Sequence, residues 1–333
     1  MSGRSIGDSY CYRKNLTTVF SGKKDYMAEY LKGKNIAITG AGSGIGKAIA
    51  LAVAREGANI VVADYGVTLD GSEPTSDIAE SVAEEIESMG VEAEPIAGDV
   101  SRMETGQQVI EAAINRWGSI DGVVCVAGIL RERMLFNMSE EEWDAVIAVH
   151  LKGHFTIYRH AMAVMRKQET GGSIVGVTSG AFTASTAQPN YSAAKGGIVS
   201  LTRSAAMTAA SISLRGGPRI NANCIAPTAR TRMSEKVPFE FETGDAEDIA
   251  PMAVYLLSDA GREVNAQIYS VVGRRISVWN QPREVRSMFA PGEAWTPAEI
   301  EELLPRTIKQ EINPFIEDLE RRMNEMATEK ENK

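Results

Sequence analysis

The chain has 333 residues, of which 44% are hydrophobic and 24% are charged, and its formal net charge is -9. This is the composition of a globular protein, and no apolar run approaches the ~20 residues that a membrane-spanning helix needs. The acidic balance argues against a nucleic-acid partner, because binding to phosphates requires a basic surface.

The first 32 residues form an N-terminal extension that contains neither the apolar stretch nor the small-residue cleavage site of a secretory signal. Three cysteines, Cys11, Cys125 and Cys224, lie far apart in the sequence. Two of them fall in apolar strand-like runs, which suits reduced buried thiols better than disulfides. We therefore expect a cytoplasmic protein.

From residue 35 onward, short β-branched runs alternate with segments of helical length, several of which have an apolar face of helical period. This alternation predicts a parallel sheet that is covered by helices on both faces. The seven expected strands are Asn35–Thr39, Asn59–Ala63, Val91–Ala97, Gly122–Val126, Ser173–Thr178, Arg219–Ile225 and Gln267–Val272.

The fold class that we expect is α/β: a single doubly wound Rossmann domain over residues 33–280 with a parallel seven-stranded sheet. A helical C-terminal extension over 281–333 follows, in which Thr296 can cap a helix and Pro305 and Pro314 must break or kink it. The expected helices of the domain are Ile45–Glu56, Asp77–Met89, Met103–Trp117, Glu140–Arg166, Ser192–Ala210 and Ala246–Leu257.

A glycine-rich turn follows the first expected strand and leads directly into the first expected helix. Glycine lets the backbone turn tightly and approach a pyrophosphate closely, while the unpaired N–H groups of a helix N-terminus face the anion. Strand, turn and helix in this order are typical of dinucleotide binding rather than of a flexible glycine loop. The expected phosphate-binding residues are Gly40, Ser43, Gly44, Ile45 and Gly46.

Asp64 ends the second expected strand, 24 positions after Gly40. A carboxylate at this place can accept hydrogen bonds from both hydroxyls of an adenosine ribose and repels a 2′-phosphate. Neither Ser43 nor the neighbours Tyr65 and Gly66 supply a cation that could neutralise such a phosphate. The sequence therefore predicts NAD rather than NADP as the cofactor.

Arg131 and Arg133 follow the fourth expected strand, where they can either bind an acyl-CoA phosphate or form a solvated pair in a loop. On the next helix, His150 and His154 have the i, i+4 spacing of metal ligands, but no carboxylate or cysteine cluster accompanies them. We expect no metal site, and instead ordinary histidines on a helix face or a polar relay near Lys195.

Tyr191 and Lys195 lie four positions apart in a segment that favours a helix, so both side chains project from one face. A phenol has a pKa of about 10 and is a poor base at neutral pH, unless a nearby positive charge favours the phenolate. The ammonium of Lys195 and a positive nicotinamide can provide that charge. Ser179, or Thr178 as the alternative, follows the fifth strand at the edge where ligands bind and can donate a hydrogen bond to a substrate oxygen.

Together these residues resemble the short-chain dehydrogenase/reductase family over about residues 33–280. The resemblance rests on Thr-Gly-(three residues)-Gly-Ile-Gly at 39–46, Val-Ala-Gly at 126–128, Ser179, the Tyr191–Lys195 pair and Ala-Pro at 226–227. It implies that Asp99 and Val100 contact adenine, that Val126, Ala127 and Gly128 line the cofactor, and that Pro227 and Thr228 close over the nicotinamide amide. The catalytic residues that it implies are Ser179, Tyr191, Lys195 and His150, although many members place an asparagine where His150 stands.

More narrowly, residues 127–134, 149–155 and 225–233 resemble the dehydrogenase part of the peroxisomal multifunctional β-oxidation enzyme and its bacterial relatives. The stretch Tyr65–Thr75 looks like an insertion that those relatives share. Ser179 precedes Tyr191 by one position fewer than is usual in the family. The narrower resemblance implies a (3R)-hydroxyacyl-CoA or a hydroxysteroid substrate, with specificity in the loops around 129–138, 181–189 and 229–245.

The sequence thus predicts an NAD-dependent oxidoreductase that interconverts a secondary alcohol and a ketone, with a 3-hydroxyacyl-CoA or a bulky hydroxysteroid or ring alcohol as its substrate. Its partner would be a small-molecule substrate, with neither nucleic acid nor membrane involved. The alternative is a catalytically weak nucleotide-binding subunit of a hetero-oligomeric dehydrogenase. The family resemblance also implies a homo-oligomer, a dimer or a tetramer, whose long helices around 140–166 and 191–210 pack against symmetry mates.

Overall fold

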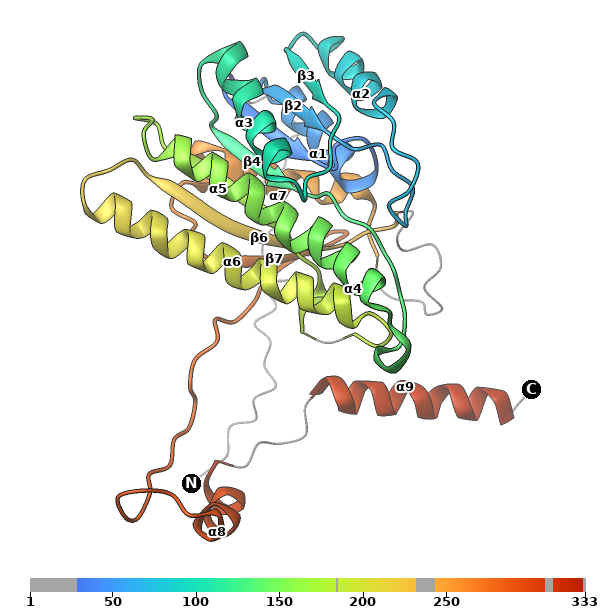
Figure 1. The fold of residues 1–333 in the computed structure, drawn as a ribbon, viewed down its shortest axis with the longest axis vertical. Coiled ribbons are helices and arrows are strands. Elements are labelled where there is room, and N and C mark those ends of the chain that lie inside the picture. The colour runs from blue at the N-terminus through green and yellow to red at the C-terminus, as the bar shows by residue number, and fades with distance from the viewer. Residues whose placement is uncertain (1–28, 184, 232–242, 309–313, 332–333) are drawn as a thin grey trace, which may run out of the picture.

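The computed structural model describes residues 29–183, 185–231, 243–308 and 314–331. Within these ranges the chain forms an eight-stranded sheet in the order β3-β2-β1-β4-β5-β6-β7-β8 (Figure 1). Strand order reverses at β1, which places a crevice beside the carboxyl end of this strand. The strands are β1 Asn35–Thr39, β2 Asn59–Ala63, β3 Ala93–Ile96, β4 Gly122–Cys125, β5 Gly172–Val177, β6 Ile220–Thr228, β7 Ile268–Val272 and β8 Arg275–Val278.

The seven predicted parallel strands are confirmed, and an eighth strand, β8, corrects the expected strand count. β8 pairs with β7 in the antiparallel sense, through a tight turn at Gly273, whose φ of +50° is in the left-handed region. Ile276 and Val278 on this edge strand are 57% and 60% exposed. The sequence did not indicate β8, because a short surface strand lacks the buried apolar run by which the other strands were recognised.

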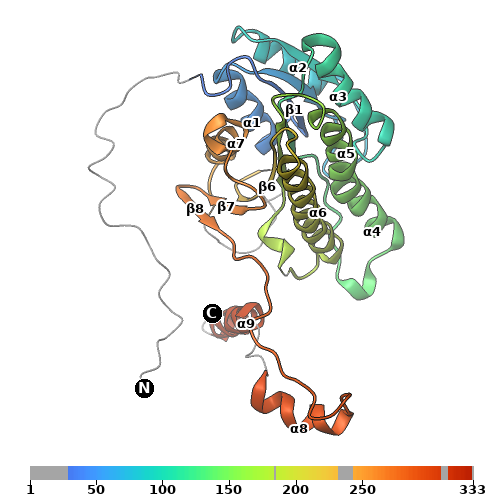
Figure 2. The same cartoon turned by 90° about the vertical axis from the view of Figure 1, so that its left-hand side faces the viewer.

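Helices cover both faces of the sheet, as the alternation of elements predicted (Figure 2). α1, α2 and α7 pack on one face, and α3, α5 and α6 pack on the other. The helices of the domain are α1 Gly44–Arg55, α2 Asp77–Glu87, α3 Met103–Trp117, α4 Glu140–Ile147, α5 Gly153–Met165, α6 Pro189–Leu214 and α7 Ala250–Leu257.

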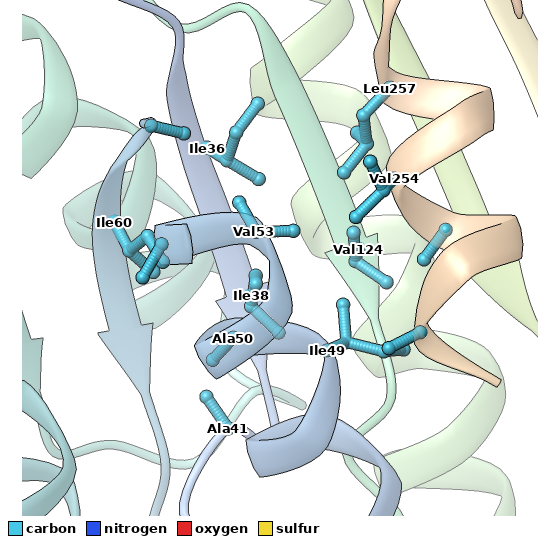
Figure 3. Packing of buried hydrophobic residues seen from close by; sticks show 14 of the residues in the cluster. Ile36, Ile38, Ala41, Ile49, Ala50, Val53, Ile60, Val124, Val254 and Leu257 are labelled. Carbon is cyan, nitrogen blue, oxygen red and sulfur yellow. The ribbon is translucent and has the colours of Figure 1, made fainter. Parts of the chain in front are cut away.

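The core on the α1 side consists of branched side chains from the central strands and the two helices above them. Figure 3 shows Ile38 of β1 and Val124 of β4 facing Ile49 of α1, with Val254 of α7 beside Val124. Ile38, Val124 and Ile49 are fully buried. Each such side chain stabilises the fold by about 1.5–3 kcal/mol relative to exposure to water. This packing fixes the helix that begins at the glycine turn.

The segment Glu140–Arg166 was expected to be one helix, but it is interrupted. α4 begins with a capping box, in which the Ser139 side chain accepts a hydrogen bond from the Glu142 N–H. A π-helical turn over Ala148–Lys152 then separates α4 from α5. Turns of this kind are frequent at functional sites, and this one contains His150.

The C-terminal extension contains α8, Pro297–Thr307, and α9, Pro314–Glu331, which both stand apart from the domain (Figures 1 and 2). Thr296 caps α8 as expected, since its side chain accepts a hydrogen bond from the Glu299 N–H. Pro305 lies inside α8, which ends two residues later. Over the described residues, no helix has both the length and the apolar character that crossing a bilayer requires. Residues 1–28 of the expected N-terminal extension lie outside the described residues.

Candidate active site

A cavity of about 870 Å³ opens where the central strands end. Its wall includes each of the residues for which the sequence predicts a catalytic or cofactor-binding role. These residues are Gly40, Ser43, Gly44, Ile45, Gly46, Asp64, Asp99, Val100, Val126, Ala127, Gly128, His150, Ser179, Tyr191, Lys195, Pro227 and Thr228. Segments that are far apart in the sequence therefore meet at one place, because parallel strands deliver their following loops to the same edge.

The glycine turn between β1 and α1 forms one end of the cavity. Gly40 has a φ of +69°, which favours glycine. A β-carbon on Gly46 would overlap the carbonyl oxygen of Gly40, so only glycine allows the turn to close this tightly. The N-terminus of α1, which begins at Gly44, lies on the cavity wall, where the helix dipole favours an anion. These features fit the pyrophosphate of a dinucleotide.

Two backbone N–H groups hold the Asp64 carboxylate, one from the glycine turn and one from the residues that follow β2. Its Oδ2 accepts a hydrogen bond from the Gly42 N–H at 2.7 Å, and its Oδ1 accepts one from the Gly66 N–H at 2.7 Å. Each carboxylate oxygen keeps a second lone pair for another donor, such as a ribose hydroxyl. Among the described lining residues, the basic side chains other than histidine are Arg131 and Lys195.

Tyr191 and Lys195 both project from the first turns of α6, as their spacing predicted. Lys195 Nζ lies 5.2 Å from the centre of the Tyr191 ring and donates a hydrogen bond to the Val177 carbonyl oxygen at 2.7 Å. The Thr178 hydroxyl donates to the Lys195 carbonyl oxygen at 2.8 Å. These two bonds connect α6 to the end of β5, so the phenol and the amine have a fixed place relative to the sheet.

Burial moves the pKa values of this pair in opposite directions. It raises the pKa of Tyr191 to about 12, against the opposing effect of the Ser179 hydroxyl, and it lowers the pKa of Lys195 to about 7. The sequence led us to expect a phenolate favoured by Lys195. In the protein alone, the lost hydration of each group is the largest effect on its pKa. The phenol is therefore protonated at neutral pH.

Ser179 is the N-cap of a short 3₁₀ turn, Gly180–Phe182, and its Oγ accepts a hydrogen bond from the Ala181 N–H at 3.2 Å. The Ser179 O–H remains able to donate. The alternative, Thr178, already donates its hydroxyl proton to the Lys195 carbonyl oxygen. The geometry therefore favours Ser179 over Thr178 as the donor to a ligand oxygen.

His150 packs its ring edge-on against Tyr191, with the ring centres 5.1 Å apart. Its Nε2 lies 2.8 Å from the Ile129 carbonyl oxygen, and a β-carbon on Gly128 would overlap the imidazole. Burial lowers the pKa of His150 well below its usual value, so the ring is neutral. Its Nδ1 is buried and has no partner among the described residues.

The second histidine, His154, is bonded to the backbone of His150. Its Nδ1 lies 2.7 Å from the His150 carbonyl oxygen, and burial lowers its pKa to about 3. Within the described part of the chain, no group of three or more histidine, cysteine, aspartate or glutamate side chains is arranged to hold a metal ion.

A comparison with models of known families now identifies the family. The model described as short chain dehydrogenase matches residues 34–239. The chain belongs to the short-chain dehydrogenase family. It is therefore an oxidoreductase, and dehydrogenases of this family typically use a nicotinamide cofactor. The family and the fold that the sequence predicted are both confirmed.

Individual relatives of the short-chain dehydrogenase family narrow the match. The hydroxyacyl-CoA dehydrogenase ChsB1 of Mycobacterium tuberculosis is 39% identical over 286 residues, which are 81% of this chain and 87% of that protein. The peroxisomal multifunctional enzyme type 2 of Drosophila melanogaster is 36% identical over 245 residues, which are 72% of this chain but 39% of that enzyme. A crystal structure of a short chain dehydrogenase from Mycobacterium avium superposes with a TM-score of 0.74 at 40% identity, covering 85% of this chain and 98% of that one. The narrower resemblance is thus also confirmed.

The insertion Tyr65–Thr75 lies at the cavity of this short-chain dehydrogenase, although the sequence assigned it no chemical role. Its Leu69 carbonyl oxygen accepts a hydrogen bond from the Leu130 N–H at 3.0 Å, and its Asp70 carbonyl oxygen accepts one from Arg131 Nε at 3.1 Å. The insertion thereby connects the end of β2 with the loop after β4. The signal for it in the sequence was its resemblance to an insertion of the multifunctional-enzyme relatives.

The loops that were expected to determine specificity contribute to the same wall. Ile129, Leu130 and Arg131 line it from the first loop, and Ala181, Ser185 and Gln188 line it from the second. Of the third loop, Ala229 and Thr231 line the cavity, and residues 232–242 lie outside the described residues.

Proposed function

We propose that the chain is an NAD-dependent oxidoreductase that interconverts a secondary alcohol and a ketone, with a 3-hydroxyacyl-CoA as its substrate class. The observation that supports this most strongly is one cavity wall that combines Tyr191, Lys195 and Ser179 with a turn that fits a pyrophosphate. The relative named as a hydroxyacyl-CoA dehydrogenase supports the substrate class. A hydroxysteroid or ring alcohol is the second substrate class to test.

Tyr191 acts as the general acid and base in this proposal. In the reducing direction, a phenol with a raised pKa is fully protonated and donates its proton to the ketone oxygen. The Ser179 hydroxyl donates a hydrogen bond to the same oxygen and stabilises the charge that develops there. In the oxidising direction, Tyr191 would first release its proton to water and then accept the proton of the alcohol oxygen, and a protonated Lys195 would favour the phenolate. A bound nicotinamide supplies the hydride acceptor or donor.

NAD is the proposed cofactor because Asp64 presents a negative charge, with open lone pairs, at the end of β2. Of the basic side chains that line the cavity within the described residues, Arg131 and Lys195, neither belongs to the glycine turn or to β2. Gly40, Ser43, Gly44, Ile45 and Gly46 would hold the pyrophosphate, Asp99 and Val100 the adenine, and Val126, Ala127, Gly128, Pro227 and Thr228 the nicotinamide half.

His150 contributes a neutral ring that supports the Tyr191 phenol from the side. Its buried Nδ1 can accept a hydrogen bond from a water molecule, which would place the ring in a proton relay. Of the two arginines, Arg133 is paired with Glu142, with Nε 2.8 Å from Oε1. Arg131 lines the cavity, and we assign it the anionic part of the CoA moiety.

The protein is also proposed to be a homo-oligomer that assembles through the helices α4, α5 and α6, which expose Trp143, Phe155 and Met207. Cys125 and Cys224 are free buried thiols, which suits a reducing compartment such as the cytoplasm.

The deciding experiment is an assay of NADH formation by the purified chain with NAD. The panel contains both enantiomers of 3-hydroxyacyl-CoA esters of several chain lengths, their N-acetylcysteamine thioesters, hydroxysteroids and ring alcohols. We expect turnover with the CoA esters. The N-acetylcysteamine thioesters should have a higher KM, because they lack the nucleotide that Arg131 would bind. Turnover with the steroids alone would make hydroxysteroids the substrate class in place of 3-hydroxyacyl-CoA. No turnover with any compound would favour the alternative function, a catalytically weak nucleotide-binding subunit.

Tyr191→Phe is the matched variant for this assay. It removes the phenolic proton and spares the glycine turn, so kcat should fall by about 10²–10⁴-fold while the affinity for NADH, measured by fluorescence, stays unchanged. Near-normal turnover of this variant would remove Tyr191 from the mechanism.

A further inference from the structure

Asn190, the residue before Tyr191 in α6, is a buried amide to which the sequence drew no attention. It is 1% exposed, and its side chain makes three hydrogen bonds. Nδ2 donates to the Arg131 carbonyl oxygen at 2.9 Å and to the Glu142 carbonyl oxygen at 3.0 Å, and Oδ1 accepts from the Tyr191 N–H at 2.7 Å. Because two partners are carbonyl oxygens and the third is an N–H, the orientation of the amide is fixed.

The three partners of this amide belong to three different elements. Arg131 ends the stretch 129–131 that lines the cavity after β4, Glu142 lies in the first turn of α4, and Tyr191 lies in the first turn of α6. Gln188, the N-cap of α6, gives that helix no side-chain cap. Asn190 therefore satisfies a first-turn N–H of the catalytic helix and, with the same group, holds the cavity wall against it.

Other contacts at this junction are more exposed. Arg133 Nε bonds to Glu142 Oε1 and Oε2 at 2.8 and 2.9 Å, and the Arg133 N–H donates to the Ala187 carbonyl oxygen at 2.8 Å. The Arg133 side chain is 51% exposed, so water screens its ion pair with Glu142. The amide of Asn190 is shielded from water, and its loss would leave two carbonyl oxygens without these donors.

The stretch 129–131 is held at its other end by His150, whose Nε2 lies 2.8 Å from the Ile129 carbonyl oxygen. Ile129 also packs in the same cluster as Tyr191 and Ala194 of α6. The stretch is thus fixed at both ends beside the phenol. A wall in this position would contact the substituents of an alcohol whose oxygen is bound to Tyr191.

We propose that Asn190 is a positioning residue that sets the wall 129–131 relative to the Tyr191 hydroxyl and thereby determines discrimination between the two enantiomers of the alcohol. When the oxygen is at Tyr191 and the hydrogen on the same carbon points to the nicotinamide, the enantiomers differ in which substituent meets the wall. If the position of the wall is fixed, the cavity has room for the substituents of one enantiomer and not for those of the other. This inference rests on the proposed function for its kinetic test but not for its structural test.

The kinetic test compares Asn190→Asp with a matched control, Asn223→Asp. Asn190→Asp keeps the shape of the side chain but turns a carboxylate oxygen toward two carbonyl oxygens. Asn223 of β6 is also 1% exposed, donates to the Val264 carbonyl oxygen at 2.9 Å and accepts from the Gln267 N–H at 3.0 Å, and it is not among the lining residues. Both variants should lower the melting temperature.

Only Asn190→Asp should lower kcat/KM for the preferred enantiomer, by ~10–100-fold, because a small misplacement of reacting groups has effects of this order. The ratio of kcat/KM for the two enantiomers should fall ~10-fold or more, while NADH affinity stays within ~2–3-fold of the parent. If Asn190→Asp does not fold, Asn190→Ala replaces it, since it removes the donors without adding charge. An unchanged enantiomer ratio in the folded variant, or an equal fall in Asn223→Asp, would overturn the proposal.

The structural test needs no turnover. Hydrogen exchange of peptides that cover residues 129–145 should be faster in the Asn190 variant than in the parent or in Asn223→Asp, because the wall and α4 lose their shared donor. Unchanged exchange there would overturn the positioning role, even if the enzyme is active. If the parent turns over none of the alcohols, the proposed function fails, and the exchange result still decides the role of Asn190.

Discussion

Lys195 and Tyr191 respond to the same surroundings in opposite ways, since burial disfavours the charged form of each. The pKa of Lys195 falls to about 7, and the pKa of Tyr191 rises to about 12. Between these values both groups are neutral in the protein alone. In the proposed mechanism, formation of the phenolate and the ammonium would therefore depend on what binds in the cavity.

The lowered pKa of Lys195 predicts how stability changes with pH. The folded amine loses its proton near pH 7, whereas in the unfolded chain its pKa is close to the usual value of 10.5. Between these two values the unfolded state binds more protons, so stability rises with pH. From about pH 7 to about pH 9.5, the melting temperature without added cofactor should rise more in the parent than in Lys195→Met. Parallel curves for the two proteins would contradict the shifted pKa.

Asp64 gives a prediction about cofactor choice. Asp64→Ala removes the proposed acceptor for the ribose hydroxyls and the charge that repels a 2′-phosphate. The ratio of kcat/KM for NAD to that for NADP should fall by ~10–100-fold, which corresponds to the loss of one or two hydrogen bonds to a charged group. The ratio is the right measurement, because loosening of the turn at Gly42 would affect both cofactors alike. A ratio that does not change would refute the role of Asp64.

At the scale of elements, the strand–turn–helix order was visible in the sequence, because each part depends on neighbours in the chain. That order led to Gly40 and Asp64, and the four-residue spacing led to Tyr191 and Lys195; all four line the cavity. Asn190 could not be found in this way, because its partners at Arg131 and Glu142 are 59 and 48 positions away. The contact of the His150 ring with Ile129 was missed for the same reason, because Ile129 lies 21 positions earlier.

The helices α5 and α6 carry the prediction about assembly. Phe155 and Met207 are 44% and 70% exposed on them, and burial against a second copy would remove this apolar surface from water. Phe155→Glu or Met207→Glu should therefore shift the mass measured by light scattering toward a smaller species. Val285→Glu is the control, because Val285 is 78% exposed but lies in the segment before α8. An unchanged mass in both helix variants would place the interface elsewhere.

At the scale of the whole molecule, the described residues form an α/β fold with the C-terminal helices α8 and α9 outside it (Figure 1). Trp279 and Gln281 bind the start of the extension to the domain: Trp279 Nε1 donates to Ser270 Oγ at 2.8 Å, and Gln281 donates to the Ala266 carbonyl oxygen at 3.1 Å. The described side chains of α8 and α9 include no buried residue.

Truncation after Pro282 should therefore leave the domain folded, because Trp279 and Gln281 are retained. We expect kcat/KM to stay within ~2–3-fold of the full chain and the melting temperature to change by no more than a few degrees, as scanning calorimetry would measure. A truncated chain that aggregates or loses turnover would show that the extension completes the domain or its assembly.

The close fit between Gly128 and His150 limits the order in which this active site can evolve. A methyl group at position 128 has no room while the imidazole is present. Any lineage that enlarges residue 128 must first shrink or turn the side chain at 150. Reconstructed ancestors and mutational libraries should therefore show that His150 is replaced before Gly128.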